Sequence, residues 1–254
     1  ISTSEDYQDQ VRIVSNINHY LSKHALSTPF VGLFRSFNNY EDTKGKLTNG
    51  GRLYAEGESY QRLSEEQRLT LRIDGECVAE VDIKASHFNV VFLVARMLDK
   101  TIPELDPDDD PYHIDSLPRD VVKEWFVAYT STLKPRTRWS KDAFMSLKEA
   151  GIELADYKVK EVAEAVASKY PFIHNLPDNS ENWGYLQRRE ADALIATMRR
   201  LAHEYDVPSY PVHDSLIVKR SDIFLVTRVM KESFRSFIGL TPVLKVTTSD
   251  EVVI

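Results

Sequence analysis

Two β-hairpin patterns, each of which places an aspartate at a strand end, constrain the fold of this chain most strongly. In LTLRIDGECVAEVDI, residues 69–83, two alternating runs flank Asp74-Gly75, a pair typical of a type I′ turn. Asp82 then lies at the end of the second run. Farther along, SYPVHDSLIVK, residues 209–219, has two short apolar runs around His213-Asp214. This pattern predicts a second tight hairpin with a carboxylate at its tip.

Helical patterns surround these hairpins, so we expect an α+β fold with an antiparallel sheet. The expected helices are residues 5–25, a segment capped by Ser86, three segments in the basic half of the chain (after Pro118, after Ser140 and at 157–169), residues 185–205, and a segment capped by Ser221. Residues 41–51 are expected to form a loop, and VLKVTT at 243–248 a closing strand.

The composition indicates a globular chain and excludes several classes of protein. Of its 254 residues, 42% are apolar, which is enough for a substantial core, and the single cysteine, Cys77, excludes an internal disulfide or a cysteine-rich zinc site. Neither a membrane span nor a secretory signal is recognisable, so we expect a cytoplasmic protein without membrane contacts. The net charge of −7 argues against a surface that coats duplex nucleic acid, but residues 119–148 hold seven Lys or Arg against three Asp or Glu.

Asp82 and Asp214 are the first candidates for chemistry. Each follows or interrupts an apolar strand, where a buried lone carboxylate is costly without a cation or a donor. If both strands belong to one sheet, the two carboxylates can hold a pair of Mg²⁺ ions about 3.5 to 4 Å apart, as in phosphoryl transfer. The alternative is that each aspartate only caps a turn.

Five segments in a fixed order, together spanning residues 50–220, resemble the family A (DNA polymerase I-like) polymerases. VAEVDIKASHFNVV at 78–91 resembles motif A, and PVHDSLIV at 211–218 resembles motif C. DPYHIDSLPRDVVKEWF at 110–126 resembles the segment leading into motif B, and LQRREADALIATM at 186–198 the helix before motif C. GGRLYAEGESYQRL at 50–63 is similar to the family's Thr-Gly-Arg-Leu stretch and the Leu-Gln-Asn-Ile element that follows it.

This resemblance implies a polymerase palm with a small helical fingers insertion. Residues 1–50 would be an N-terminal helical segment (a reduced thumb or linker), 51–100 the first part of the palm, 101–180 reduced fingers and 181–254 the second part of the palm. The implied activity is template-directed addition of nucleotides to a 3′-hydroxyl by a two-metal mechanism, with Mg²⁺, or alternatively Mn²⁺, as cofactor. The implied partners are primer-template nucleic acid, nucleoside triphosphates and other domains of a longer protein or a clamp, in a bacterial, phage or mobile-element setting.

The resemblance also implies roles for individual residues. Asp82 and Asp214 would be catalytic metal ligands, and Ile83 would lie at the metal and in the nucleotide site. Arg119 and Lys123, four residues apart and hence on one helix face, would meet the triphosphate, Lys123 as a catalytic residue. The implied nucleic-acid contacts are Arg52, Gln61, Gln187 and His213, to which the basic segment adds Arg136 and Arg138 beside Trp139.

Three departures from the family pattern bear on activity. His87 stands where the DNA polymerases have a glutamate that helps to exclude a ribose 2′-hydroxyl, so we place His87 near the nucleotide sugar and expect weak exclusion of ribonucleotides. Ser215 follows Asp214 where polymerase I enzymes have glutamate; His-Asp-Ser resembles the related phage-type single-subunit RNA polymerases. The downstream aromatic and Tyr-Gly of motif B are missing, with Phe126 and Tyr129 out of register.

Other functions remain open from the sequence. One is a metal-dependent hydrolase that uses His87, His113 and His213 with the two aspartates, although no pair of histidines has the spacing of ligands on one helix. Another is a catalytically weak or inactive polymerase fold that only binds nucleic acid. A third is an RNA polymerase or primase, because the sequence does not define the sugar, the template or the primer requirement.

Overall fold

The chain forms two compact units. The computed structural model describes residues 5–38, 46–103, 106, 109–130, 136–176, 181–239 and 241–249, without the side chains of 181–183. Unit 1 comprises Ile1–Lys84 and Gly184–Ile254, and unit 2 comprises Ala85–Trp183. The assignment of the four sequence segments to thumb, palm and fingers stays a prediction.

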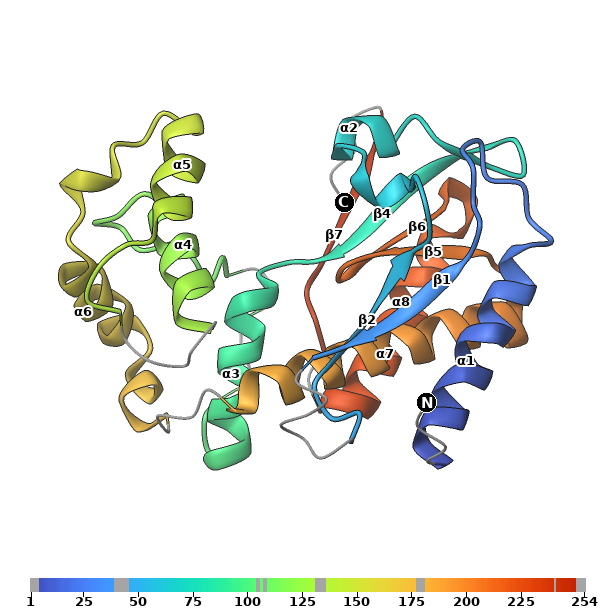
Figure 1. Ribbon diagram of the computed structural model, residues 1–254. Coiled ribbons are helices and arrows are strands. Elements are labelled where there is room, and N and C mark those ends of the chain that lie inside the picture. The colour runs from blue at the N-terminus through green and yellow to red at the C-terminus, as the bar shows by residue number, and fades with distance from the viewer. Residues whose placement is uncertain are drawn as a thin grey trace. The chain divides into compact units, whose positions relative to one another are not determined.

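Unit 1 is built on antiparallel strands, which confirms the α+β class expected from the sequence. Its five-stranded sheet has the order β3-β4-β6-β5, and β7 also pairs with β4; β1 and β2 form a separate two-stranded sheet (Figure 1). The strands are β1 (Leu33–Phe37), β2 (Gly50–Ala55), β3 (Arg72–Ile73), β4 (Glu76–Ile83), β5 (Ser209–Val212), β6 (Ser215–Lys219) and β7 (Leu244–Thr248).

Both expected hairpins are present. Asp74 and Gly75 have φ angles of 52° and 84°, the two positive values that a type I′ turn requires, and they join β3 to β4. Glycine suits this turn because it has no Cβ to clash at positive φ. In the second hairpin, Val212 pairs with Ser215, so His213 and Asp214 form the turn between β5 and β6.

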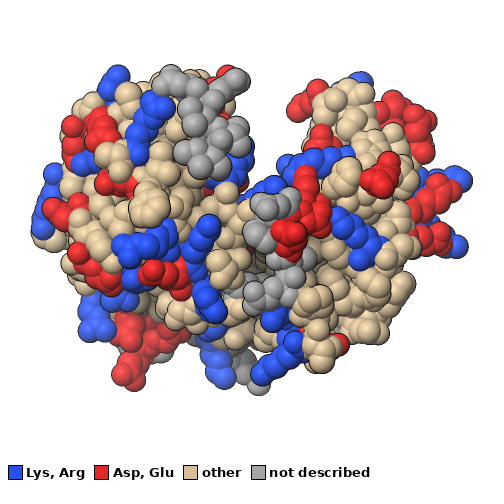
Figure 2. Space-filling model, turned by 180° about the vertical axis from the view of Figure 1, so that it is seen from behind, with Lys and Arg blue, Asp and Glu red and all other residues tan. Residues whose placement is uncertain are grey.

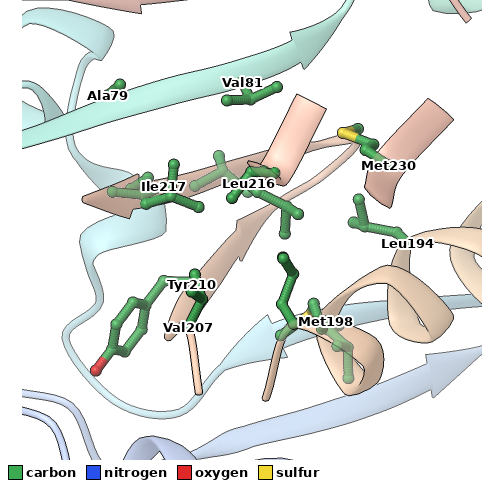
Figure 3. Packing of buried hydrophobic residues seen from close by; sticks show 14 of the residues in the cluster. Ala79, Val81, Leu194, Met198, Val207, Tyr210, Leu216, Ile217 and Met230 are labelled. Carbon is green, nitrogen blue, oxygen red and sulfur yellow. The ribbon is translucent and has the colours of Figure 1, made fainter. Parts of the chain in front are cut away.

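Among the described residues, unit 1 also contains α1 (Glu5–Leu21), α2 (Glu65–Arg68), α7 (Glu181–Tyr205, from Gly184 onward) and α8 (Ile223–Ile238). The expected cap of α8 was wrong by one residue, because Asp222 is the N-cap and Ser221 lies in the preceding 3₁₀ turn. The helices and the sheet enclose one core, to which Val81, Leu216, Leu194 and Met230 contribute from β4, β6, α7 and α8 (Figure 3). This core fixes the strand ends that carry Asp82 and Asp214.

Unit 2 is helical. It contains α3 (Ser86–Leu98), α4 (Arg119–Thr130), α5 (Lys141–Glu149) and α6 (Val159–Lys169). Ser140 caps α5 as expected, with its hydroxyl accepting from the N–H of Ala143. Ser86, in contrast, is the first residue of α3 rather than its cap, because Ala85 occupies the cap position with φ 58°. Buried aromatic rings join these helices: Phe88, Phe92, Tyr112, Trp125, Phe126, Tyr129 and Tyr170.

Charge is mixed over the surface. Figure 2 shows Lys and Arg interspersed with Asp and Glu on the face in view, as expected for a chain with a net charge of −7. Among the residues described, none of the helices combines the length and the apolar character needed to cross a bilayer.

Candidate functional site

The register of unit 1 brings Asp82 and the Asp214 turn to the same end of the sheet. Val81 in β4 pairs with Leu216 in β6. One residue farther along, Asp82 therefore lies across from Ser215, the first residue after the turn. β4 and β6 are neighbours in the sheet (Figure 1). The two carboxylates therefore belong to adjacent strand ends.

The two carboxylates interact electrostatically. Burial raises the pKa of Asp82 to about 7, and the negative charges of Asp214 and Glu80 add to the effect. A hydrogen bond from the N–H of Ile83 and the charge of Lys245 oppose it only in part. Since repelling carboxylates are stabilised by a cation between them, this cluster has the electrostatic character of a cation site.

The donor set fits a magnesium ion that keeps part of its hydration. No group of three or more His, Cys, Asp or Glu is placed to share a metal in the part of the chain that the structure describes. Mg²⁺ is commonly held by one or two carboxylates together with waters and substrate phosphates. Asp82 and Asp214 meet this requirement, and Ile83, whose side chain is buried, can add only its backbone carbonyl.

A buried ion pair lies beside the two aspartates. Glu80, on the same face of β4 as Asp82, accepts two hydrogen bonds from Arg68 of α2, at 2.8 Å from Nε and 3.0 Å from Nη2. The Ser215 hydroxyl lies 2.7 Å from Glu80 Oε1 and 2.9 Å from the carbonyl oxygen of Val212. Glu80 is only 6% exposed, and the guanidinium group of Arg68 compensates its negative charge.

Arg52 lies in the electrostatic field of the same site. Its Nη2 is 2.7 Å from Glu190 Oε1 on α7. Burial lowers its pKa, but the charges of Glu190 and Asp214 outweigh burial and raise the pKa above the usual value. Its Nε is buried and has no hydrogen-bond partner among the described residues. Arg52, one of the predicted nucleic-acid contacts, is thus held beside Asp214 by a carboxylate of α7.

A second ion cluster anchors the β1–β2 sheet to α7. Arg35, whose side chain is 3% exposed, donates to Asp192 at 2.5 Å and to the carbonyl oxygen of Gly51 at 2.6 Å. Arg188 binds the same carboxylate at 3.0 Å. Both guanidinium groups lie 5.1 Å from the ring centroid of Phe37. This cluster fixes the strand on which Arg52 follows Gly51.

Gly51→Ala is expected to lower the free energy of unfolding by about 2 to 4 kcal/mol, because it combines positive-φ strain with a steric clash. Gly51 has a φ of +85°, and an added Cβ would lie 2.9 Å from Arg35 Nη2. That guanidinium cannot move aside freely, because Asp192 and the Gly51 carbonyl hold it. Urea unfolding followed by circular dichroism measures the change.

Gly239→Ala is the matched control for this prediction. Gly239 has a φ of +81° and open space around the position of a Cβ. Its substitution should cost only the conformational strain, about 1 kcal/mol. Equal losses in the two variants would contradict the proposed role of the Arg35 cluster.

The other predicted nucleic-acid contacts of unit 1 differ in their surroundings. The Gln61 side chain accepts from the N–H of Ala55 at 3.0 Å and donates to the carbonyl oxygen of Pro211 at 2.7 Å, so its amide joins β2 to β5. Gln187 accepts a longer, 3.3 Å bond from Asn38. His213 is exposed on the turn and has a φ of 54°, a strained value for a residue with a side chain.

In unit 2, Arg119 and Lys123 share the exposed side of α4, as their spacing predicts. Arg119 Nε donates to Asp110 Oδ2 at 2.6 Å, and its guanidinium lies 5.2 Å from the ring centroid of Tyr112. His87 Nδ1 lies 3.0 Å from Thr130 Oγ1, which connects α3 to the end of α4. This contact gives His87 a structural role within unit 2, and its predicted role beside the nucleotide sugar stays a prediction.

Within the basic segment, residues 119–148, the structure describes all residues except 131–135. Arg136 and Arg138 are exposed, and Lys134 lies outside the described residues. Trp139, expected to lie between these charges for stacking, is half-buried and donates from Nε1 to the carbonyl oxygen of Tyr157 at 2.7 Å. The indole therefore supports the fold of unit 2, while the two arginines remain accessible.

Sequence reasoning missed the residues that support the site from within. Glu80, Arg68 and Glu190 were not among the predicted residues. Glu80 carried a usable signal, because a carboxylate two positions before Asp82 in the apolar run CVAEVDI lies on the same strand face. Arg68 and Glu190 carried none, since their partners are defined by tertiary packing.

Comparison with known proteins gives a structural similarity of low score. No protein-family model matches the chain, and no curated protein matches its sequence. Among solved structures, the chain is similar to the POL domain of Pol1 from M. smegmatis, solved in complex with DNA primer-template and dNTP, with a TM-score of 0.45 and 13% identity. The match covers 94% of this chain and 51% of that chain, so this chain spans about half the length of the domain it matches.

Proposed function

We propose that the chain is the core of a template-directed nucleotidyltransferase that adds nucleotides to a 3′-hydroxyl. The observation that carries the proposal is that Asp82 and Asp214 lie at the same end of the sheet, where burial and mutual repulsion raise the pKa of Asp82 to about 7. The family resemblance of motifs A and C supports it, because the two aspartates that it singles out lie at the end of β4 and in the turn before the neighbouring strand β6. DNA-directed DNA synthesis is the specific activity that we propose.

The proposed mechanism depends on charge. Divalent cations, when bound, would neutralise the charge of the triphosphate and of the attacking oxygen. Asp82 and Asp214 would hold them, with the backbone carbonyl of Ile83 as a further oxygen donor. Arg119 and Lys123 of unit 2 would bind the triphosphate and stabilise the negative charge that grows on the leaving pyrophosphate.

A panel of substrates tests the proposed function. The protein is incubated with primed and unprimed DNA or RNA templates, Mg²⁺ or Mn²⁺, and dNTPs or rNTPs separately, and extension is followed on denaturing gels. We expect primer-dependent extension on a DNA template. Products on unprimed templates would instead indicate a primase or RNA polymerase. Template binding without product under every condition would indicate a binding module and contradict the proposal.

Arg136 and Arg138 are expected to contact the template or displaced strand. Replacing both with alanine should reduce the slope of log affinity against log salt by about 1 to 2, because fewer counterions are released on binding. Fluorescence anisotropy with labelled single-stranded DNA measures the slope. Lys158→Ala/Lys160→Ala, which removes two exposed charges from the start of α6 in the same unit, is the control. Equal slopes in wild type and the Arg136/Arg138 variant would exclude a strand contact there.

His87 is expected to influence sugar choice. Wild type should use rNTPs with less than about a hundredfold penalty, equivalent to about 2.7 kcal/mol, because an imidazole cannot reproduce the charge of a glutamate. His87→Ala should then change the dNTP to rNTP ratio of kcat/KM. Thr130→Val removes the same hydrogen bond without altering His87 and should leave the ratio unchanged. Identical ratios in all three proteins would assign His87 to packing alone.

A further inference from the structure

The strand face beside Asp82 carries a hydrogen-bond network that the proposed mechanism does not use. It runs from Arg68 on α2 through Glu80 on β4 to Ser215 on β6. Arg68 and Glu80 have 13% and 8% of their side-chain surfaces exposed. A bidentate pair with so little exposure has few alternative geometries, so Glu80 presents Oε1 at a fixed place.

Ser215 connects this fixed carboxylate to the turn. Its hydroxyl lies 2.7 Å from Glu80 Oε1 and 2.9 Å from the carbonyl oxygen of Val212, and its single proton serves one acceptor at a time. Val212 and Ser215 are the residues on either side of the His213–Asp214 turn. The hydroxyl therefore spans the base of the turn and links it to the strand that bears Asp82.

The turn requires such support. His213 has a φ of 54°, a region that costs a residue with a Cβ about 1 kcal/mol or more. Asp214 is adjacent to this strained residue, and its charge and that of Asp82 repel each other. Without a restraint, the repulsion favours movement of Asp214 away from Asp82, and the strain at His213 favours a different conformation of the turn.

We propose that Glu80, acting through Ser215, is a positioning residue that holds the Asp214 carboxylate at its working distance from Asp82. This inference rests on the proposed function, because the distance matters for a cation shared by the two aspartates. Arg68 fixes Glu80, Glu80 fixes Ser215, and Ser215 fixes the turn. Partners of this kind, one step removed from metal ligands, typically change metal affinity or activity by 10- to 100-fold when they are removed.

Ser215→Ala is the principal test, because it removes the link and leaves the Arg68–Glu80 pair intact. Mn²⁺ binding is measured by electron paramagnetic resonance, and single-nucleotide incorporation gives kcat and KM. We expect the Mn²⁺ dissociation constant to rise about tenfold and kcat at fixed Mn²⁺ to fall about tenfold. The KM for the nucleotide should stay within about twofold, because the triphosphate contacts are unchanged.

Glu80→Gln and the double variant with Ser215→Ala form a mutant cycle. If the two side chains act as one device, the double variant should bind Mn²⁺ no more weakly than the weaker single variant. Glu80→Gln leaves the charge of Arg68 without its partner, so circular dichroism is used to establish whether this variant folds. If Glu80→Gln is unfolded, the result for Ser215→Ala alone tests the proposal. Ser233→Ala is the matched control, because Ser233 is a buried serine of α8 whose hydroxyl has no partner among the described residues.

The outcomes separate this inference from the proposed function. Wild type that binds no more Mn²⁺ than Asp82→Asn and extends no primer would overturn the proposed function. Wild type that binds Mn²⁺ and extends a primer, with Ser215→Ala matching it in both measurements, would overturn only the positioning role. A tenfold loss in Ser215→Ala, unmatched by Ser233→Ala, supports it.

Discussion

Asp82→Asn and Asp214→Asn are each expected to reduce nucleotide incorporation by orders of magnitude while the fold remains intact. Each change replaces a carboxylate with a neutral amide of nearly the same shape, so packing is preserved and charge is lost. A cation held by two carboxylates loses half of its protein charge in either variant, and transition-state stabilisation falls with it. Single-turnover primer extension at saturating Mg²⁺ and nucleotide measures the effect.

Asp82→Asn should also stabilise the protein in the absence of divalent ions. The carboxyl has a pKa of about 7 in the folded chain and 3.8 as its ordinary value, so the folded state binds more protons between these values. The protonated carboxyl therefore contributes to the free energy of unfolding below about pH 4, and this contribution is lost as the pH rises to about 7. At pH 8 the neutral amide avoids this loss, and we expect a gain of about 2 to 4 kcal/mol.

Thermal unfolding in EDTA at pH 5 and pH 8 measures this gain. The difference between variant and wild type should be larger at pH 8, and added Mg²⁺ should raise the melting temperature of wild type more than that of the variant. Asp9→Asn, at an exposed position on α1, is the control and should change neither activity nor melting temperature appreciably. Full activity in either site variant would remove both aspartates from the mechanism, whatever their effect on stability.

The sequence was sufficient for the features of this fold that depend on neighbouring residues. The Asp74-Gly75 turn and the His213-Asp214 turn were both predicted, because alternation and turn chemistry act over a few residues. Helix starts were predicted less well, because more than one adjacent residue can occupy the cap position. Ser221 and Ser86 can each cap a helix, but Asp222 and Ala85 take the cap positions, and neither makes a side-chain cap hydrogen bond.

The candidate site was likewise predictable only where it depends on neighbouring residues. Asp82 and Asp214 could be paired from the sequence once two hairpins were assigned to one sheet. Their supporting partners could not, because Arg52 meets Glu190 across 138 residues and Arg35 meets Asp192 across 157. Such pairs depend on how α7 packs against β1 and β2, which no local pattern encodes. The internal hydrogen bonds of Gln61 are a further example, since they depend on the approach of β2 to β5.

Lys123→Ala is expected to lower kcat by about 10²- to 10³-fold, the scale for removing one donor that acts in the transition state. Lys123 is exposed on α4, so the loss of its ammonium should not disturb the buried side that holds Val122, Trp125 and Phe126. Arg119→Ala should act mainly on nucleotide affinity, and by less. Its guanidinium is bound to Asp110 at 2.6 Å, and a triphosphate would have to displace that carboxylate, which offsets part of the gain.

Rapid-quench kinetics separates these effects, because it measures the maximal rate and the nucleotide dissociation constant independently. Lys160→Ala removes an exposed lysine from another helix of unit 2 and controls for the loss of charge. Asp110→Asn provides the converse test. This change weakens the bond between residue 110 and Arg119, which competes with the triphosphate. It should therefore tighten nucleotide binding when Arg119 is present, but not when it is combined with Arg119→Ala. If Lys123→Ala and Arg119→Ala both retain wild-type constants, α4 presents a solvated surface and its resemblance to motif B has no functional meaning.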